Sequence, residues 1–221
     1  MDQNTKKQRV AEAVLDYIDN GESLGIGSGS TVNILIENLS KVKNKIRNVV
    51  SSSVKSTELL ESNGFEVSEL RDVGRLTKYI DGADEVNKDL QLIKGGGGAL
   101  TREKILAHNS NQFICIVDDS KKVDMLGKFP LPIEVIPLSR SSVSLELIKH
   151  GGRPVLRENF VSDNGNLILD IHNLQIMEPI KLEQTINNIP GVVTNGIFAL
   201  DHANVLLCAS DNGVDKTDLN A

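Results

Sequence analysis

Short apolar runs alternate with helical patterns through the first half of the chain, and this alternation constrains the fold more than any other feature. Strand candidates end at Ile26, Val50, Ile80 and Val117, and a helical pattern of apolar residues lies between each consecutive pair. Strands that are separated by helices form parallel sheets, because the crossover returns the chain to the same end of the sheet. The sequence therefore predicts an α/β fold with a Rossmann-like parallel-sheet domain.

The pattern changes near Pro130. Strand and helix signals then follow in the order β-α-β-β-α-β, with strands near 131–137, 154–157, 167–169 and 192–198 and helices near 144–150 and 180–186. Asn164 and Gly165 are typical of a hairpin turn, here between 160–161 and 167–169. This element order is ferredoxin-like. We therefore expect a smaller α+β (ferredoxin-like) domain at 131–204, inserted into a Rossmann-like catalytic domain at 1–130 plus 205–221, because the β-like run 204–208 returns to the first sheet.

Composition excludes several classes of protein. The 221 residues include 24% charged and 39% hydrophobic residues, as in ordinary globular proteins. A formal charge of −6, aromatics at 3% and no tryptophan argue against a nucleic-acid partner. We see neither a signal peptide nor a membrane-spanning run, so we expect a cytoplasmic protein without a membrane partner. The two cysteines lie singly in apolar segments and the four histidines are scattered, so we expect buried thiols and no metal.

The stretch 81–103 concentrates residues that can do chemistry. Asp81 and Asp84 follow the strand candidate 76–80, at the sheet edge where open α/β sheets bind ligands. Lys94 follows a second apolar run, and Gly95 to Gly98 then offer backbone N–H groups without blocking side chains. The alternative interpretation is a solvated acidic loop followed by a flexible glycine link. That alternative leaves the flanking lysine unexplained, so we favour a site.

Glu103 lies unusually in the helical pattern that follows the glycines. At about 100° per residue, Ala99, Leu100, Leu106 and Ala107 form an apolar stripe with Glu103 near its centre. A carboxylate in that position is expected to be partly desolvated and more basic than usual. Together with the aspartates and the lysine, it predicts acid–base chemistry on a small polar substrate.

A Gly/Ser-rich turn at 27–31 predicts an anion site. It connects the strand 23–26 to a helix, so that free N–H groups, hydroxyls and the positive end of the helix dipole converge. No Gly-Lys-Ser/Thr ends the turn, and Ser30 stands at the third glycine position of a dinucleotide fingerprint. A single phosphate on a small molecule fits better than a nucleotide. The alternative is an ordinary helix N-cap by Ser30.

These motifs together resemble the type A ribose-5-phosphate isomerase family along essentially the whole chain. The resemblance is carried by 27–31, 51–53, 81–85, 93–104, 119–121, 128–132, 151–154, 163–166 and 189–193. The lysine–glycine–arginine–glutamate–lysine segment at 94–104 is the most specific of these. One departure is Ser28, where the family commonly has threonine; the hydroxyl donor is kept and a methyl group is lost.

The resemblance implies an aldose–ketose isomerase of the non-oxidative pentose phosphate pathway, which interconverts D-ribose 5-phosphate and D-ribulose 5-phosphate through a cis-enediolate. It implies that Glu103 is the proton-transferring base and that Lys94 stabilises the developing oxyanion. Asp81 and Asp84 would hold sugar hydroxyls and assist ring opening. Implied substrate contacts are Ser28, Gly29, Ser30, Thr31, Gly82, Ala83, Gly95, Gly96, Gly97 and Lys121, with Lys7 as a further phosphate contact.

For Lys121 and Lys7 the alternative is a surface lysine with no ligand. The family further implies no cofactor, no metal, a small-molecule sugar phosphate as partner, and a homodimer or homotetramer. Two other functions share features with the chain. Coenzyme A transferases combine a Gly/Ser turn with an inward glutamate, which acts there as a nucleophile. Sugar-phosphate-sensing domains of transcription regulators need an attached DNA-binding module, and no basic recognition helix is visible.

Overall fold

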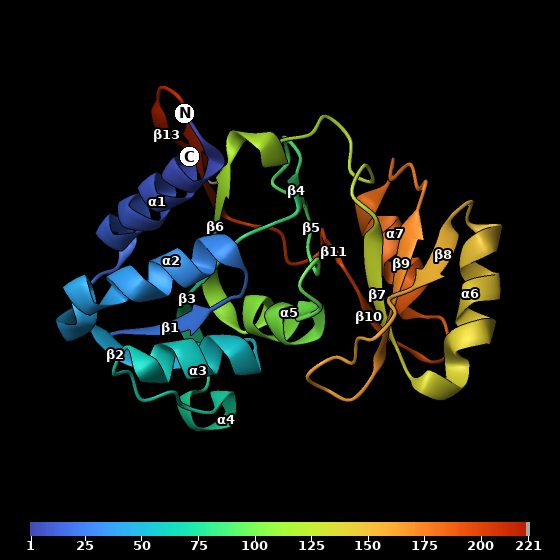
Figure 1. The fold of residues 1–221 in the computed structure, drawn as a ribbon, viewed down its shortest axis with the longest axis horizontal. Helices are drawn as coiled ribbons and strands as arrows, with labels where there is room; N and C mark the ends of the chain where they lie inside the picture. Colours follow the sequence, from blue (N-terminus) through green and yellow to red (C-terminus); the bar gives the residue numbers. More distant parts are fainter. Residues whose placement is uncertain (220–221) are drawn as a thin grey trace. The chain divides into compact units, whose positions relative to one another are not determined.

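The computed structural model describes residues 1–219, which form two compact units (Figure 1). Unit 1 contains Met1–Ala83, Arg102–Lys121 and the chain from Ala203 onward, and unit 2 contains Asp84–Thr101 and Lys122–His202. The chain therefore leaves unit 1 twice and returns twice. Both units depend on segments that are distant in the sequence.

Unit 1 is built on a six-stranded sheet in the order β13-β12-β6-β3-β1-β2. Its strands are β1 (Glu22–Ile26), β2 (Ile46–Ser51), β3 (Leu76–Asp81), β6 (Ser110–Asp118), β12 (Val205–Ser210) and β13 (Gly213–Asp218). All neighbouring pairs are parallel except β12 and β13, which form an antiparallel hairpin. The predicted Rossmann-like parallel sheet is confirmed, and the run 204–208 does return to it as β12 beside β6.

Helices cover both faces of this sheet. They are α1 (Gln3–Ala13), α2 (Ser30–Asn38), α3 (Val54–Ser62), α4 (Leu70–Val73) and α5 (Leu100–His108), with short 3-10 helices at Val14–Tyr17, Leu39–Lys45 and Asp119–Lys121. Ile26, Ile80 and Ile114 share one apolar cluster with residues of α1 and α2. Because side chains alternate along a strand, Tyr79 and Asp81 point to the opposite face. On that face, Tyr79 and Leu106 of α5 both approach the backbone of Gly25.

Unit 2 contains a four-stranded antiparallel sheet in the order β10-β7-β9-β8. Its elements are β7 (Leu131–Val135), a 3-10 turn (Pro137–Ser139), α6 (Arg140–Lys149), β8 (Arg153–Leu156), β9 (Leu167–His172), α7 (Pro179–Asn187) and β10 (Val192–Asn195). This is the predicted ferredoxin-like order. A small second sheet pairs β5 (Leu92–Ile93) with β4 (Glu85–Val86) and β11 (Ile197–Phe198).

The structure differs from the sequence prediction in three places. Residues 84–101 and 122–130 group with unit 2 rather than with the first domain, because β4 pairs with β5 and β5 pairs with β11. The predicted hairpin around Gly165 is wrong in its first strand: β8 ends at Leu156, and 157–166 is a loop. Residues 65–67, for which the sequence also predicts a strand, make only one isolated bridge, between Val67 and Val49. Within residues 1–219, no helix has the length and apolar character needed to cross a membrane.

Candidate active site

Asp81 ends β3 and is fully buried, with an exposed fraction of 0%. Its Oδ1 accepts hydrogen bonds from the backbone N–H of Ser28 at 3.0 Å and of Gly82 at 2.7 Å. The approach of the 27–28 turn depends on Gly27, because a Cβ there would lie 1.9 Å from Cγ of Asp81. The carboxylate therefore fixes the turn at the end of β1 to the end of β3.

Tyr79 lies two residues before Asp81 on the same face of β3, and its hydroxyl donates a hydrogen bond to Oδ2 of Asp81. Burial raises the pKa of the Tyr79 phenol well above its ordinary value, and the negative charges of Asp81 and Glu103 raise it further. The ring packs against Phe113, with 4.8 Å between ring centroids. Tyr79 is therefore a permanent donor, and sequence analysis missed it. The spacing of two residues in a strand was the signal that could have indicated it.

Glu103 lies on the first turn of α5 and is 3% exposed, as its place in the apolar stripe predicts. Leu100, Leu106 and Ala107 of the same helix are buried with it. Ser28 donates its hydroxyl to Oε1 of Glu103 at 2.6 Å. One residue of the Gly/Ser turn thus contacts two carboxylates, Asp81 through its N–H and Glu103 through its hydroxyl.

The Gly/Ser turn leads into α2, which begins at Ser30. The N-cap position is Gly29, with φ of 100°, and no side chain caps this helix end. The alternative of an ordinary N-cap by Ser30 is therefore wrong, because Ser30 is the first helical residue. Gly29, Ser30 and Thr31 are at least partly exposed, so their N–H and hydroxyl groups remain open to an anion at the positive end of the helix dipole.

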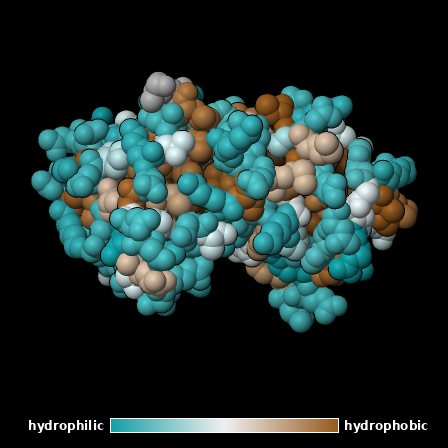
Figure 2. Space-filling model, turned by 90° about the horizontal axis from the view of Figure 1, so that it is seen from above, coloured by the Kyte–Doolittle hydropathy of each residue, from teal (hydrophilic) through white to brown (hydrophobic). Residues whose placement is uncertain are grey.

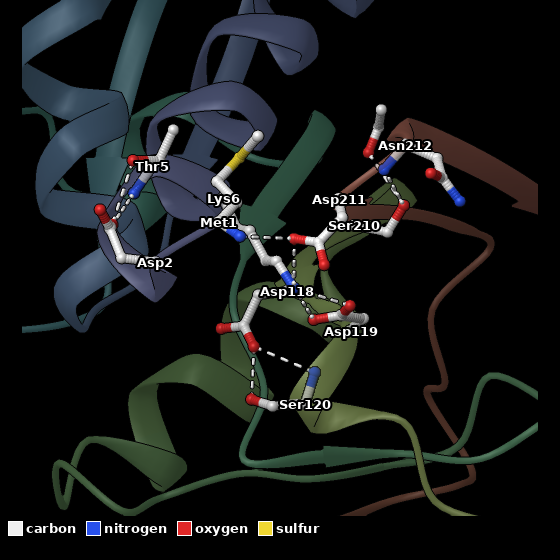
Figure 3. Close-up of polar contacts among 11 residues, drawn as sticks. Met1, Asp2, Thr5, Lys6, Asp118, Asp119, Ser120, Ser210, Asp211 and Asn212 are labelled. Atoms are coloured by element: carbon white, nitrogen blue, oxygen red, sulfur yellow. Dashed lines mark hydrogen bonds and ion pairs between the residues drawn. The ribbon is translucent and has the colours of Figure 1, made fainter.

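A charged network ties α1 to the 3-10 turn Asp119–Lys121 (Figure 3). Nζ of Lys6 lies 2.9 Å from both carboxylate oxygens of Asp119 and 3.2 Å from Oδ1 of Asp211. The hydrogen bond to Asp119 raises the pKa of Lys6. The amino terminus of Met1 also pairs with Asp211, at 3.1 Å. The ammonium group of Lys6 is thus occupied by two aspartates. Its neighbour Lys7 is therefore the lysine of α1 that can bind a ligand.

The buried Asp118 also connects α1 to the 3-10 turn. It is 1% exposed and accepts hydrogen bonds from the N–H and hydroxyl of Ser120 and, at 3.2 Å, from the side-chain amide of Gln3. These hydrogen bonds outweigh burial and lower the pKa of Asp118. Lys121 ends this turn and is partly exposed. The predicted substrate contact Lys121 and the predicted phosphate contact Lys7 therefore lie on segments that one network connects.

In unit 2, Asp84 is partly exposed and accepts a hydrogen bond from the N–H of Gly96 at 2.8 Å. Here too a glycine permits the approach, because a Cβ on Gly96 would lie 2.7 Å from Oδ1 of Asp84. Gly96 and Gly97 are exposed, whereas Gly95 and Gly98 are buried. The glycines are therefore an ordered loop with one carboxylate against it, rather than a free linker.

Lys94 precedes this loop and is 3% exposed. Its Nζ lies 5.5 Å from the centroid of the Phe198 ring, a cation–π distance. Its backbone N–H donates to the carbonyl of Gly196 at 2.9 Å, so the connection between β10 and β11 fixes the main chain of Lys94. A buried ammonium group beside an aromatic ring is a strong, localised positive charge.

Sequence analysis also missed two charged residues of unit 2. Arg157 contacts the carbonyls of Gly95 and Gly96, and Glu134, 0% exposed, accepts from Thr101, Ser162 and the side-chain amides of Asn164 and Asn166. Neither residue has a local sequence signal, because Arg157 lies 61 positions from Gly96 and Glu134 lies 28 positions from Ser162.

In residues 1–219 no three His, Cys, Asp or Glu side chains gather as a metal site.

Unit 1 thus contains a buried glutamate with a hydroxyl partner and an uncapped helix end, and unit 2 contains a buried lysine. Groups of these kinds suit proton transfer on an anionic substrate. Residues 48–213 match the family model described as ribose 5-phosphate isomerase A (phosphoriboisomerase A). A ribose-5-phosphate isomerase A of Buchnera aphidicola is 51% identical over 214 residues, which are 97% of this chain and 96% of that protein.

Solved structures agree with this match. The ribose 5-phosphate isomerase A of Neisseria gonorrhoeae is 47% identical, with a TM-score of 0.96 over 98% of this chain and 97% of that one. A D-ribose-5-phosphate isomerase in complex with phospho-erythronic acid is 36% identical, with a TM-score of 0.95 over 99% and 100%. The enzyme of Methanocaldococcus jannaschii is 35% identical, with a TM-score of 0.92 over 97% and 99%. The chain belongs to the ribose 5-phosphate isomerase A family of aldose–ketose isomerases.

Proposed function

We propose that the protein interconverts D-ribose 5-phosphate and D-ribulose 5-phosphate with Glu103 as the general base. The observation that carries this proposal is the hydrogen bond of 2.6 Å from Ser28 to Glu103, which joins the base to the turn that can bind phosphate. A coenzyme A transferase would use the same glutamate as a nucleophile. Family membership and the open helix end of α2 favour the isomerase.

The proposed reaction moves one proton between neighbouring carbons. Glu103 takes the proton from C2 of the open-chain aldose, which leaves a cis-enediolate, and returns it to C1. The hydroxyl proton of O2 passes to O1, which gives the ketose. Proton abstraction next to a carbonyl needs a positioned base and a fixed positive group for the oxygen that becomes negative. The proposal assigns the second role to Lys94, whose ammonium group is held in a buried setting.

The remaining site residues are proposed to bind and orient the substrate. Asp84, which is partly exposed, is assigned to the sugar hydroxyls and to ring opening. Asp81 has both carboxylate oxygens engaged, so we assign it to the same task through the turn that it holds. The phosphate is assigned to Ser28, Gly29, Ser30 and Thr31, with Lys121 and Lys7, while Gly82, Ala83 and Gly95 to Gly97 supply backbone contacts.

The ligand of one relative supports an enediolate. That protein was solved with phospho-erythronic acid, a sugar acid that carries a phosphate. An ionised carboxylate is planar with two oxygens that share negative charge, and in this it resembles a planar cis-enediolate, whose two oxygens lie on neighbouring carbons. Tight binding of such an acid is expected of an enzyme that is complementary to its transition state. We therefore expect phospho-erythronic acid to be a competitive inhibitor here.

The deciding experiment is turnover of D-ribose 5-phosphate by the pure chain, with EDTA present. We expect isomerisation that survives chelation, loses most of its kcat/KM with ribose in place of ribose 5-phosphate, and is inhibited by inorganic phosphate. Equal kcat/KM for the two sugars would contradict the phosphate site. Loss of activity with EDTA and recovery with Mg²⁺ or Zn²⁺ would contradict metal-free chemistry. No turnover of either sugar would sink the isomerase proposal itself.

We also propose that the enzyme is a cytoplasmic homodimer or homotetramer. Unit 2 exposes apolar side chains along the turn before α6 and on α6 itself, with exposed fractions of 96% for Leu138, 63% for Leu145 and 54% for Ile148. Figure 2 shows apolar residues that interrupt a mostly hydrophilic surface. Exposed apolar groups of this kind often mark interfaces. Light scattering of the wild type and of Leu145→Lys tests this, because a monomeric wild type would contradict it.

A further inference from the structure

Arg157 lies directly after β8 and makes five polar or ring contacts within unit 2. Its Nε and Nη2 donate to the two carboxylate oxygens of Asp170, at 2.9 and 2.6 Å. Its Nη1 donates to the carbonyls of Gly95 and Gly96, each at 3.2 Å. Its guanidinium carbon lies 5.2 Å from the centroid of the Phe160 ring. Asp170 thus holds the guanidinium group so that its remaining edge faces the glycine loop.

The peptide between Gly95 and Gly96 is held from both sides. In a trans peptide the C=O and N–H bonds point in opposite directions. The carbonyl of Gly95 accepts from Arg157, while the N–H of Gly96 donates to Asp84 at 2.8 Å. One rigid peptide plane therefore transmits the position of Arg157 to the carboxylate of Asp84.

The next peptide follows the same geometry. The carbonyl of Gly96 also accepts from Arg157, so the N–H of Gly97 points away from the guanidinium group. That is the direction in which the N–H of Gly96 reaches Asp84. The two amides are thereby presented on one side of the loop, as donors in a nest are.

A run of glycines needs such a restraint. Gly95 and Gly98 have φ angles of 103° and 85°, which glycine adopts readily, but each glycine also has many other conformations to lose. Phe160 closes the far end of the loop, because a Cβ on Gly98 would lie 2.1 Å from its Cζ. Arg157 and Phe160 both belong to the loop 157–166, which is therefore a brace for the glycine loop.

We propose that Arg157 is a positioning residue for the isomerase reaction: it fixes the Gly95–Gly96 peptide and thereby orients Asp84 and the amide of Gly97 towards the substrate. The inference rests on the proposed function and adds to it a residue outside the predicted site. The alternative role for Arg157 is a purely structural ion pair with Asp170 of β9. In that role Arg157 would stabilise unit 2, but its substitution would not change the orientation of Asp84.

A double-mutant cycle separates these two roles. Arg157→Met keeps the aliphatic stem and removes the donors, and Asp84→Asn weakens the acceptor on the other side of the peptide. We expect Arg157→Met to lower kcat by about tenfold or more in the wild type, by far less in the Asp84→Asn background, and to change KM little. Equal fold-losses in both backgrounds would overturn the proposal. Arg157→Lys, which can still reach a carbonyl, should recover part of kcat.

The matched control is Arg153→Met, because Arg153 is an exposed arginine at the start of the same strand, β8. It should leave kcat within about twofold of the wild type, as an ordinary surface substitution does. A similar loss of kcat in Arg153→Met and Arg157→Met would mean that damage to β8, rather than loss of the hydrogen bonds from Arg157 to Gly95 and Gly96, reduces activity.

Amide hydrogen exchange gives a readout that does not depend on turnover. In wild type, the N–H groups of Gly96 and Gly98, which donate to Asp84 and to the carbonyl of Gly95, should exchange slowly relative to exposed loops. Arg157→Met or Asp170→Asn should accelerate their exchange, while Arg153→Met should not. Unchanged exchange in Arg157→Met and Asp170→Asn would overturn the proposal that Arg157 holds the glycine loop, even if the enzyme is active. If the wild type fails to turn over ribose 5-phosphate, the proposed function falls, and the exchange experiment still decides whether Arg157 holds the loop.

Discussion

Asp81 and Asp84 are three positions apart in the chain and lie in different units, and their surroundings differ sharply. Asp81 is 0% exposed and accepts from two backbone amides and a tyrosine hydroxyl. Asp84 is partly exposed and accepts from the amide of Gly96. A carboxylate that is buried with its oxygens engaged sets the geometry of its neighbours, whereas one that is open on one side can contact a substrate.

The same contrast holds for the two halves of the predicted site. In unit 1, Asp81, Tyr79, Ser28 and Glu103 form a chain of hydrogen bonds in which all members except the half-buried Ser28 are buried. In unit 2, the glycine loop and Asp84 are partly exposed. Arg157 donates to the carbonyls of Gly95 and Gly96, on the side of the loop opposite to Asp84. Substitutions in the first half should therefore damage stability and rate together, and substitutions in the second half should mainly damage rate.

The largest expected effect is that of Glu103→Gln, which tests whether the buried half supplies the base. The amide keeps the size and can still accept from Ser28, but it cannot take a proton. Positioned bases contribute about 10²–10⁴-fold, or roughly 3–5.5 kcal/mol of barrier, so kcat should fall by that much and KM far less. Steady-state kinetics at saturating substrate measures this. A variant that keeps more than about a tenth of kcat would transfer the role to Asp81 or Asp84.

Exchanging each aspartate for asparagine tests the contrast directly. Asp81→Asn places an amide where Tyr79, Ser28 and Gly82 all donate, so we expect a loss of about 1–3 kcal/mol in the free energy of unfolding as well as a fall in kcat. Asp84→Asn should cost no more than about 0.5 kcal/mol while lowering kcat. Thermal unfolding of both variants, with a shift of about 2–4 °C per kcal/mol, checks this. Equal Tm losses would abolish the distinction between the two carboxylates.

Two glycines sharpen the same comparison. A Cβ on Gly27 would lie 1.9 Å from Cγ of Asp81, and one on Gly96 would lie 2.7 Å from Oδ1 of Asp84. Overpacking costs about 1–3 kcal/mol, and Gly27→Ala should fall in the upper half of that range, because Asp81 is buried and cannot shift without losing hydrogen bonds. Gly96→Ala should cost less stability, because the partly exposed Asp84 can move. The reverse order of Tm values would show that Asp84 is the more rigidly held residue.

Much of the fold could be predicted because its signals are local. The strand–helix alternation, the return of β12 and the ferredoxin-like order each follow from short-range patterns. The hairpin at Gly165 was predicted with the wrong first strand, because Ser162, Asn164 and Asn166 bind the buried Glu134 instead of pairing. A carboxylate 28 to 32 positions away leaves no trace in the turn's own sequence.

The site shows the same division. The burial of Glu103 was predictable from the helical stripe around it, and the open end of α2 from the Gly/Ser turn. The partners of those residues were not, because Tyr79 looked like an ordinary strand residue and Arg157 like an ordinary surface charge. Sequence patterns indicate which side chains are buried, but the long-range hydrogen bonds that hold them are set by tertiary structure.

The smallest expected effect concerns the charged network at the edge of unit 1. Hydrogen bonds from the amino terminus and Lys6 lower the pKa of Asp211 below its ordinary 3.8. A lowered folded-state pKa adds stability above the unfolded value, and this is lost as pH falls through the folded value. Asp211→Asn should therefore have a slightly lower Tm than wild type at pH 7, and the difference should begin to shrink as pH falls to about 3.8 and should vanish below the lowered pKa of folded Asp211. A Tm difference that does not shrink as pH falls from 7 into the acid range would contradict this account.

The position of β12 has a consequence for synthesis on the ribosome. β12 lies between β6 and β13, and its Val205 is in register with Ile114 of β6, whereas unit 2 needs only residues up to His202. A chain that emerges from its amino end can therefore complete the inserted unit while the parallel sheet around it is still missing two strands. Until the last residues appear, the open side of β6 is an unpaired edge that another nascent chain could join. Unit 1, which carries the proposed base Glu103, is thus finished last, and a chain truncated shortly before residue 205 would be an aggregation-prone intermediate.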